Sequence, residues 1–435
     1  MSLSLSPAVT FAIGDLLEGR PAVADAALQA WRNQALGWAL EMGLPGASQE
    51  AWRLTPLKTL LTTPFRPAGR GDAVDQAPDL AVPELPLRLV FVNGVFDAAQ
   101  SQVEPWPAGV TLTVGESLPP TAWDYLGKVA SLEQDVFVAL NQACTPGVVC
   151  LEVAAGRRIQ QPIHLVFIGQ SPSQPSFNFP RWLVILEDQA ELTLVETYHS
   201  TGPAGCSAVG EVVLGAHARL NHTYLQQEGP QACHLAHTAV HQATGSHYDL
   251  LAITTGASFA RHTPTLRQQG PETMTHLSGL VLLQGQQVAD THSFLGLSHP
   301  QGYSRQLHKA ILGGSAQAIF SGRVRVAAQA QQTNAGQLNR TLLLSPQARV
   351  DSQPQLEIEA DDVKCTHGAT VSDLDPAEVF YLQSRGIDPA AGRTLLLTGF
   401  AGEILQHPSF PSLKARVQAA LNDLSRPAAP PDATP

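Results

Sequence analysis

The chain contains 435 residues, of which 44% are hydrophobic, and it carries a formal net charge of −11 at pH 7. This length is enough for a large core and for about two or three domains. The acidic balance argues against nucleic acid as a partner, because no basic patch stands out that would neutralise phosphates. No apolar run approaches the roughly 18 residues of a membrane span, so no membrane partner is expected either.

The start of the chain and its cysteines predict a cytoplasmic protein. The first residues lack the basic and apolar regions of a signal peptide. The five cysteines are odd in number and widely scattered, which suits a reducing compartment better than a disulfide framework. They include no CxxC pair, which excludes a self-contained zinc ribbon or a ferredoxin-type cluster motif.

A helix is predicted near the N-terminus, from Pro21, a residue tolerated at the first helical position, to a glycine cap at Gly43. Its apolar face has three- and four-residue spacing and contains Leu28, Trp31, Ala35, Trp38 and Met42. Residues 66–86 are rich in proline and are interpreted as a linker. The sequence then predicts a strand ending in a tight turn (87–94), a second linker-like region without regular structure (104–120) and a mixed helical segment (122–144).

From residue 148 to about residue 363, short runs of alternating apolar residues predict strands. A turn pattern returns in which an alanine precedes an apolar strand, at Ala190, Ala218, Ala316 and Ala348. The intervals are irregular but short, for example 218 minus 190, which is 28 residues. Repetition on this scale predicts a solenoid whose coils bury their apolar faces on one another, and the strand-like units favour a β-helix. A β-sandwich is the alternative.

The tail is predicted to be helical. Asp375 and Pro376 combine an N-cap with a proline at the first helical position, and this helix stops at Gly386. A second helix starts at Asp388, and a third starts near Pro411 with one apolar face formed by Leu413, Val417, Leu421 and Leu424. The expected organisation is a mainly β chain with helical ends: an N-terminal helical region and linker (1–86), a β-helix core (87–363) with a mixed segment (104–147), a C-terminal helical domain (364–425) and a disordered tail (426–435).

Two acids, a thiol and an imidazole stand together after the predicted strands, at Asp361, Asp362, Cys365 and His367. On an extended backbone, Cys365 and His367 point to the same face. A thiolate and a neutral imidazole suit iron or zinc, but two ligands are too few for a structural tetrahedral site. Any further ligands would come from elsewhere in the chain or from a partner. By spacing alone, a buried cysteine and a hydrogen-bonded histidine at a domain junction are the simpler interpretation.

Twelve of the fifteen histidines lie within residues 199–308. His234, His237 and His241 have metal-like spacing, but on a strand His234 points away from the other two. These histidines are therefore interpreted as polar positions on the outside of the solenoid.

Two enzyme classes are considered and disfavoured. A Cys–His hydrolase would use Cys365 as its nucleophile, but the neighbouring aspartates oppose thiolate formation. A β-helix polysaccharide lyase would need a charged cluster in a groove, for which Arg323 and Arg325 are the nearest match, and both are interpreted as outward strand residues. The chain also lacks a glycine-rich phosphate loop, so any ATP would be bound by another subunit.

Three long stretches carry a sequence resemblance that does not depend on residue spacing. They are residues 332–344, 354–370 and 380–387, followed by Gly399 and Phe400. With them, the run from residue 322 to 400 resembles the SufB/SufD family of iron–sulfur cluster assembly proteins. The Cys-Thr-His-Gly-Ala-Thr segment is similar to the SufD branch, and the cysteine-rich N-terminal motif of SufB has no counterpart. Weaker similarity at residues 50–57 and 91–94 extends the resemblance over most of the chain.

The resemblance implies a right-handed parallel β-helix between helical ends, and a cytoplasmic scaffold without catalytic activity. It implies pairing with SufB through the β-helix and binding of SufC, an ABC-type ATPase, by the C-terminal helices. A transient iron–sulfur cluster or iron would form at the SufB interface, with His367 and nearby Cys365 on this chain's side, and this chain alone would hold no cofactor. A cysteine desulfurase is implied indirectly, and the isolated chain is able to form a homodimer. The segment beside SufC would contain Phe380, Tyr381, Leu382, Arg385 and Gly386.

Overall fold

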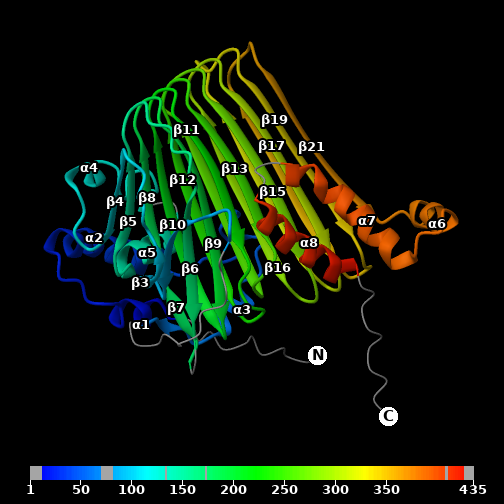
Figure 1. The fold of residues 1–435 in the computed structure, drawn as a ribbon, viewed down its shortest axis with the longest axis horizontal. Helices are drawn as coiled ribbons and strands as arrows, with labels where there is room; N and C mark the ends of the chain where they lie inside the picture. Colours follow the sequence, from blue (N-terminus) through cyan, green and yellow to red (C-terminus); the bar gives the residue numbers. More distant parts are fainter. Residues whose placement is uncertain (1–11, 70–81, 133–134, 172–173, 407–409, 426–435) are drawn as a thin grey trace.

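The computed structural model describes residues 12–69, 82–132, 135–171, 174–406 and 410–425. Its centre is a parallel β-solenoid in which successive strands alternate between two sheets (Figure 1). The predicted mainly β solenoid with helical ends is confirmed, and the β-sandwich is wrong, because the coils pair in parallel. The predicted tail at 426–435 and the linker residues 70–81 lie outside the described residues.

The two sheets share the strands almost equally. Sheet A contains β1 (Arg66–Pro67), β4 (Val110–Gly115), β5 (Val148–Val153), β7 (Ser176–Asn178), β8 (Arg181–Leu186), β10 (Ala204–Leu214), β12 (Cys233–Gln242), β14 (Phe259–Gln268), β16 (Val288–Leu297), β18 (Gln317–Val326) and β20 (Arg349–Ile358). Sheet B contains β2 (Leu87–Val92), β3 (Val95–Gln102), β6 (Ile163–Gln170), β9 (Glu191–Thr201), β11 (Arg219–Gln226), β13 (His247–Thr254), β15 (Met274–Leu283), β17 (Tyr303–Leu312), β19 (Asn334–Leu343) and β21 (Lys364–Asp373).

The repeated alanines close the turns between the sheets. The N–H of each donates to the carbonyl three residues earlier at 3.0 to 3.2 Å, and each methyl group is buried, at Ala190, Ala218, Ala316 and Ala348. In two of these turns the preceding residue has positive φ, at Gln189 and His217. Only a small side chain fits where the chain turns into the core, so the alanine pattern identifies the coil corners that the sequence predicts.

Aliphatic side chains stack in columns inside the solenoid. On sheet A the strand register aligns one column through seven successive coils: Val184, Val212, Val240, Leu266, Leu295, Val324 and Leu356. Every member except Leu356, in the last coil, is buried. Burying one such side chain contributes about 1.5 to 3 kcal/mol, so adding a coil stabilises the coil before it.

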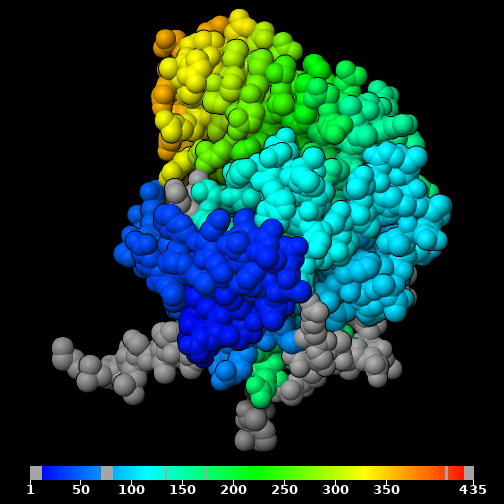
Figure 2. Space-filling model, turned by 90° about the vertical axis from the view of Figure 1, so that its left-hand side faces the viewer, coloured from blue at the N-terminus to red at the C-terminus, as the bar shows by residue number. Residues whose placement is uncertain are grey.

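The N-terminal helices pack on the outer face of sheet A, and the blue and cyan N-terminal segments face the viewer in Figure 2. These helices are α1 (Ile13–Glu18), α2 (Ala26–Met42), the 3-10 turn η1 (Glu50–Trp52), α3 (Lys58–Thr62), α4 (Pro120–Trp123) and α5 (Val136–Cys144). The predicted start of the long helix at Pro21 is wrong, because Asp25 caps α2 by accepting the Leu28 N–H at 2.9 Å. Its apolar face also differs, since Ala39 is buried in place of Trp38. The region at 104–120, predicted to lack regular structure, contains strand β4. Its alternating Val-Thr-Leu-Thr-Val pattern is short, and prolines on both sides of it favour a loop interpretation.

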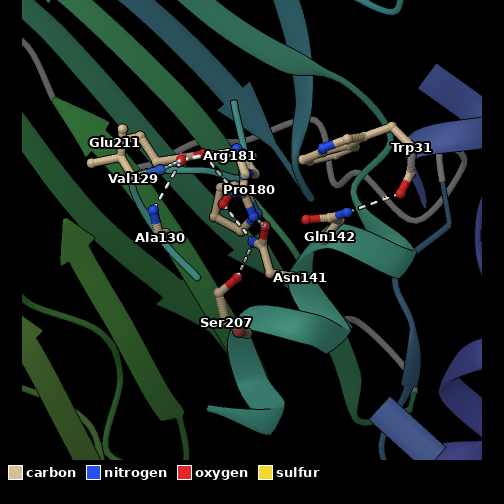
Figure 3. Close-up of polar contacts among 10 residues, drawn as sticks. Trp31, Val129, Ala130, Asn141, Gln142, Pro180, Arg181, Ser207 and Glu211 are labelled. Atoms are coloured by element: carbon tan, nitrogen blue, oxygen red, sulfur yellow. Dashed lines mark hydrogen bonds and ion pairs between the residues drawn. The ribbon is translucent and has the colours of Figure 1, made fainter. Parts of the chain in front are cut away.

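A buried ion pair fixes these helices to the solenoid (Figure 3). Arg181 on β8 and Glu211 on β10 are fully buried and bind each other. The Glu211 carboxylate also accepts the backbone N–H groups of Gly127, Val129 and Ala130 at 2.9 to 3.2 Å. The segment before α5 is therefore held on the sheet by a carboxylate with all its charge compensated.

The C-terminal helices are α6 (Pro376–Ser384), α7 (Pro389–Gly402), the 3-10 turn η3 (Ile404–Gln406) and α8 (Pro411–Ser425). Among them, α7 and α8 cover the outer face of sheet B, whereas α6 lies beyond the last coil (Figure 1). The three predicted helix starts are confirmed, and the predicted apolar face of α8 packs against β11, β13 and β15. The predicted domain boundary after residue 363 falls too early, because β21 pairs with β19 as one more strand of the solenoid.

The two ends of the solenoid differ. At the N-terminal end the last strands of the two sheets are β3 and β4, which run antiparallel to their one neighbour each, and Phe96 and Trp106 pack against the core there. At the other end, β20 pairs only with β18 and β21 pairs only with β19 within the described residues. The solenoid therefore ends in two strands with free edges. No helix in the described part of the chain is long and apolar enough to cross a membrane.

Candidate functional site

Cys365 and His367 lie on β21, the last strand of the solenoid. The register places Cys365 beside Ala335, which belongs to the core, and His367 beside Gln337. Both side chains therefore occupy positions on the inward face of the last coil. They share a face as the sequence predicts, but on a solenoid strand and not at the start of the helical tail.

A polar column leads through the solenoid to His367. Gln306, Gln337 and His367 follow one another on β17, β19 and β21. The Gln337 side chain donates to Gln306 Oε1 at 3.5 Å, and the Ser293 hydroxyl on sheet A donates to the same oxygen at 3.0 Å. Gln306 and Gln337 are buried, whereas His367 is exposed at the open end. The imidazole is thus accessible to a partner while its backbone is held by the ladder.

The Cys365 thiol is half-buried. Burial raises its pKa, and a backbone hydrogen bond with Ala335 opposes part of this change. The isolated chain therefore keeps Cys365 as a thiol at neutral pH. A metal ion or a positive group from a partner would favour the thiolate.

Apolar side chains surround this edge without being covered. Ile358 on β20 is 43% exposed and Val371 on β21 is 53% exposed. Leu356 is only partly buried at the end of its column. Unpaired strand edges and exposed aliphatic groups gain free energy when another chain covers them. This end of the solenoid therefore has the features of a protein-binding surface.

In the structure, too, Cys365 and His367 provide only two of the four ligands that a tetrahedral metal site needs. Among the described residues, the only set of three or more His, Cys, Asp and Glu side chains whose ligand atoms close together lies elsewhere, at Cys206, Glu228 and His234. Asp361 and Asp362 are exposed, and the backbone of Asp362 binds Gln331 and Gln332. Cys365 and His367 remain two potential ligands on one strand.

The histidines do not lie where the sequence interpretation placed them. His222, His234 and His262 are buried inside the solenoid among Trp182, Tyr198 and Tyr224, so the outside location is wrong. His237 is buried on the opposite face of β12, beneath the N-terminal helices near Trp52. Burial lowers the pKa of His237 to about 3, with nearby arginines acting in the same direction. The spaced trio therefore cannot form one metal site.

Sequence reasoning missed the cluster of Cys206, Glu228 and His234. His234 was considered with its neighbours in sequence, whereas its spatial neighbours come from the coil before it and from a turn. The signal that could have found them is the repeat itself, because 234 minus 206 is 28, one coil length.

The predicted SufC-side residues lie on α6 and directly after it. None of the α6 residues is buried, and Phe380 and Tyr381 are the most exposed aromatic side chains described, at 70% and 56%. Arg385 stacks on the Tyr381 ring at 5.2 Å, and Leu382 packs toward Gly392 of α7. Gly386 has a φ of +81°, which a glycine adopts without strain and which ends the helix.

The basic pair weighed for a lyase is occupied by ion pairs. Arg323 contacts Glu50 at 3.2 Å and Glu357 at 3.3 Å, and Arg325 contacts Glu359 at 3.0 Å. These contacts match the outward strand positions expected for both arginines. They leave no basic cluster in a groove at this place.

Comparison with known proteins gives consistent matches along the chain. Family models match the SufBD protein N-terminal region at residues 21–165 and the SufBD core domain of the SUF system for FeS cluster assembly at residues 167–400. An iron–sulfur cluster assembly SufBD family protein of Synechocystis is 37% identical over 394 residues, 87% of each chain. The chloroplastic protein ABCI7 of Arabidopsis thaliana is 34% identical over 403 residues, 90% of this chain and 84% of that protein. SufD of Escherichia coli is 30% identical over 395 residues, 89% of this chain and 91% of that protein.

The solenoid and the matched core domain define a protein of SUF-type iron–sulfur cluster assembly. The chain belongs to the SufBD family. One of the relatives is chloroplastic, so the family is not confined to one compartment, and the cytoplasmic location of this chain stays a prediction.

Proposed function

We propose that this chain is a SufD-type scaffold subunit without catalytic activity of its own. It pairs end to end with a SufB-type solenoid, and a nascent iron–sulfur cluster forms where the two chains meet. The observation that carries this proposal is the open end of the solenoid, where free strand edges and exposed aliphatic groups surround Cys365 and His367. A second chain that supplies a thiolate and a carboxylate would complete the ligand set of a soft or borderline metal.

The C-terminal helices are the second partner surface in this proposal. Helix α6 lies beyond the last coil in Figure 1 and has no buried residue, and its Phe380 and Tyr381 side chains are exposed. Exposed aromatic residues of this kind are typical anchors of protein interfaces. We assign this surface to the ATPase SufC, with Leu382, Arg385 and Gly386 holding the shape of the helix end.

Contacts behind α6 would link that ATPase to the solenoid. The buried Lys309 on β17 donates to the Phe400 carbonyl of α7 at 2.8 Å and pairs with Glu403 at 2.7 Å. On the neighbouring strand Arg340 lies 3.7 Å from the same carboxylate. ATP-driven movement of the helices would act on strands β17 and β19, and thereby on β21.

The cluster role is tested on the complex of this chain with SufB and SufC. His367→Ala and Cys365→Ser complexes are purified and their bound iron and acid-labile sulfide are measured. Thr366→Ala is the matched control, because Thr366 is also exposed but occupies the opposite face of β21. Loss of cluster with His367→Ala and retention with Thr366→Ala is expected. Equal cluster content in the two complexes would remove His367 from the mechanism.

SufC binding is tested with Phe380→Ala and Tyr381→Ala, each measured by capture of purified SufC. Point variants are preferable to removing residues from Asp375 onward, because α8 covers sheet B and its loss would expose the apolar surface beneath. Leu40→Ala, at a similarly exposed apolar residue on α2, is the control. Capture that survives both aromatic substitutions would show that SufC binds elsewhere.

A further inference from the structure

Three side chains with metal-binding groups meet inside the solenoid, far along the chain from β21. Cys206 on β10 stands directly beside His234 on β12 in the strand register. Glu228 lies in the turn before β12. The Cys206 Sγ atom, a ring nitrogen of His234 and a carboxylate oxygen of Glu228 all lie within 4.8 Å of one another, and all three residues are buried.

The polar contacts of this cluster leave it incomplete. Glu228 Oε2 accepts the Gln226 side-chain N–H at 3.0 Å and lies 2.7 Å from His234 Nδ1. Neither ring nitrogen of the buried His234 makes a hydrogen bond of normal geometry within the described residues, although Nδ1 faces Glu228. Buried imidazole nitrogens normally have a partner, and a metal ion is one that a histidine accepts.

The walls of the cluster are aromatic and do not compete for its ligand atoms. The rings of Tyr198 and Tyr224 lie 4.7 and 6.0 Å from the His234 ring. The Tyr198 hydroxyl donates to Glu196 at 2.6 Å and not to a candidate ligand. The three candidate ligands are therefore buried beside two tyrosine rings.

The donor set and the charges suit one class of ion. Thiolate, imidazole and carboxylate together favour borderline divalent transition metals over calcium or magnesium. A thiolate and a carboxylate carry two negative charges, so a divalent ion makes the buried site neutral, as burial requires. Metal bonds of about 2.0 to 2.3 Å place tetrahedral ligand atoms roughly 3.3 to 3.7 Å apart, which small side-chain rotations reach from the present spacing.

We propose that Cys206, Glu228 and His234 bind a borderline divalent transition-metal ion, such as Fe²⁺ or Zn²⁺, inside the solenoid. Three protein ligands leave one coordination position open, as in sites that exchange or react and unlike closed structural sites. This site belongs to the chain alone and requires no partner subunit. It is distinct from the shared edge at Cys365 and His367.

Cobalt(II) is the probe, because a bound thiolate gives it a charge-transfer absorption that oxygen and nitrogen ligands do not. The full chain is refolded with Co²⁺, since the site is buried, and passed through a desalting column. We expect retained Co²⁺ with thiolate absorption, proton release on binding and a raised melting temperature. Cys206→Ser should abolish the absorption, and Glu228→Gln should keep it while weakening affinity more than about tenfold.

Two cysteine variants make the test specific. Cys233→Ser changes a buried thiol next to His234 that packs on the outer face, among Phe177 and Phe259. Cys365→Ser changes the thiol at the open end. Both should retain the full signal. The proposal is overturned if the unmodified chain shows no thiolate absorption, if the absorption survives Cys206→Ser, or if it disappears with Cys365→Ser alone. Circular dichroism verifies that Cys206→Ser folds, and Glu228→Gln supplies an independent affinity readout if it does not.

Discussion

Replacing Glu211 by glutamine should detach the N-terminal region from the solenoid. The substitution keeps the shape of the side chain but leaves the fully buried Arg181 without a countercharge. Removing one partner of a buried pair costs about 3 to 5 kcal/mol of unfolding free energy. Glu211 Oε2 accepts all three backbone N–H groups and Oε1 faces Arg181, so a glutamine oxygen that keeps the three N–H groups turns its own NH₂ group toward the arginine. We therefore expect the upper part of that range.

The assay is urea denaturation followed by tryptophan fluorescence and by circular dichroism. Glu359→Gln is the control, because Glu359 also pairs with an arginine, Arg325 at 3.0 Å, but both side chains are about half exposed. An exposed pair contributes about 0.2 to 1 kcal/mol, so the two variants should differ by at least about 2 kcal/mol. Equal denaturation midpoints for Glu211→Gln and Glu359→Gln would refute the stabilising role of the buried Arg181–Glu211 pair. Partial recovery is expected in a variant that combines Arg181→Met with Glu211→Leu, because no charge then stays buried unpaired.

Two further predictions concern the solenoid itself. Burial lowers the pKa of His308 to about 4 and that of His237 to about 3, so below pH 6.5 the unfolded chain binds protons that the folded chain does not. Each such histidine should reduce the unfolding free energy by about 1.4 kcal/mol per pH unit from pH 6.5 down to about 4, measured by denaturation at several pH values, and His308→Gln should flatten this slope. A slope that His308→Gln leaves unchanged would contradict the assignment. Gly210→Ala should lower the free energy of unfolding by about 1 to 3 kcal/mol, because the added methyl group meets the Trp182 ring. Gly37→Ala, on the exposed face of α2, is the control and should be neutral or stabilising. Equal melting temperatures of the two variants would argue against the close packing at Gly210.

The features that were predictable from the sequence are those encoded locally or by the repeat. The alanine corners predicted the solenoid, because each corner needs a small residue wherever it occurs. The caps at Asp375 and Asp388 predicted two helix starts, since capping depends on adjacent residues only. The resemblance of residues 322–400 indicated the family that the comparisons establish.

The errors have a common physical origin in burial by distant elements. His237 resembles a surface residue until the N-terminal helices are placed on sheet A. Glu228 and Cys206 become neighbours only through the coil register. The boundary after residue 363 was misplaced because β21 is polar and exposed, and its strand character comes from pairing with β19. A strand at an open end lacks the apolar alternation that identifies the others.

The unlike ends of the solenoid determine how many subunits can join. A stack of coils with two open ends could accept neighbours on both sides and grow into a filament. Here the terminal strands β3 and β4 run antiparallel to their neighbours at one end, whereas β20 and β21 continue the parallel ladders at the other. A neighbour that extends the parallel ladders is therefore expected at β20 and β21, so the chain would join one neighbour in this way. Joining two such chains at their open ends consumes both, so the pair terminates its own growth and encloses a single seam.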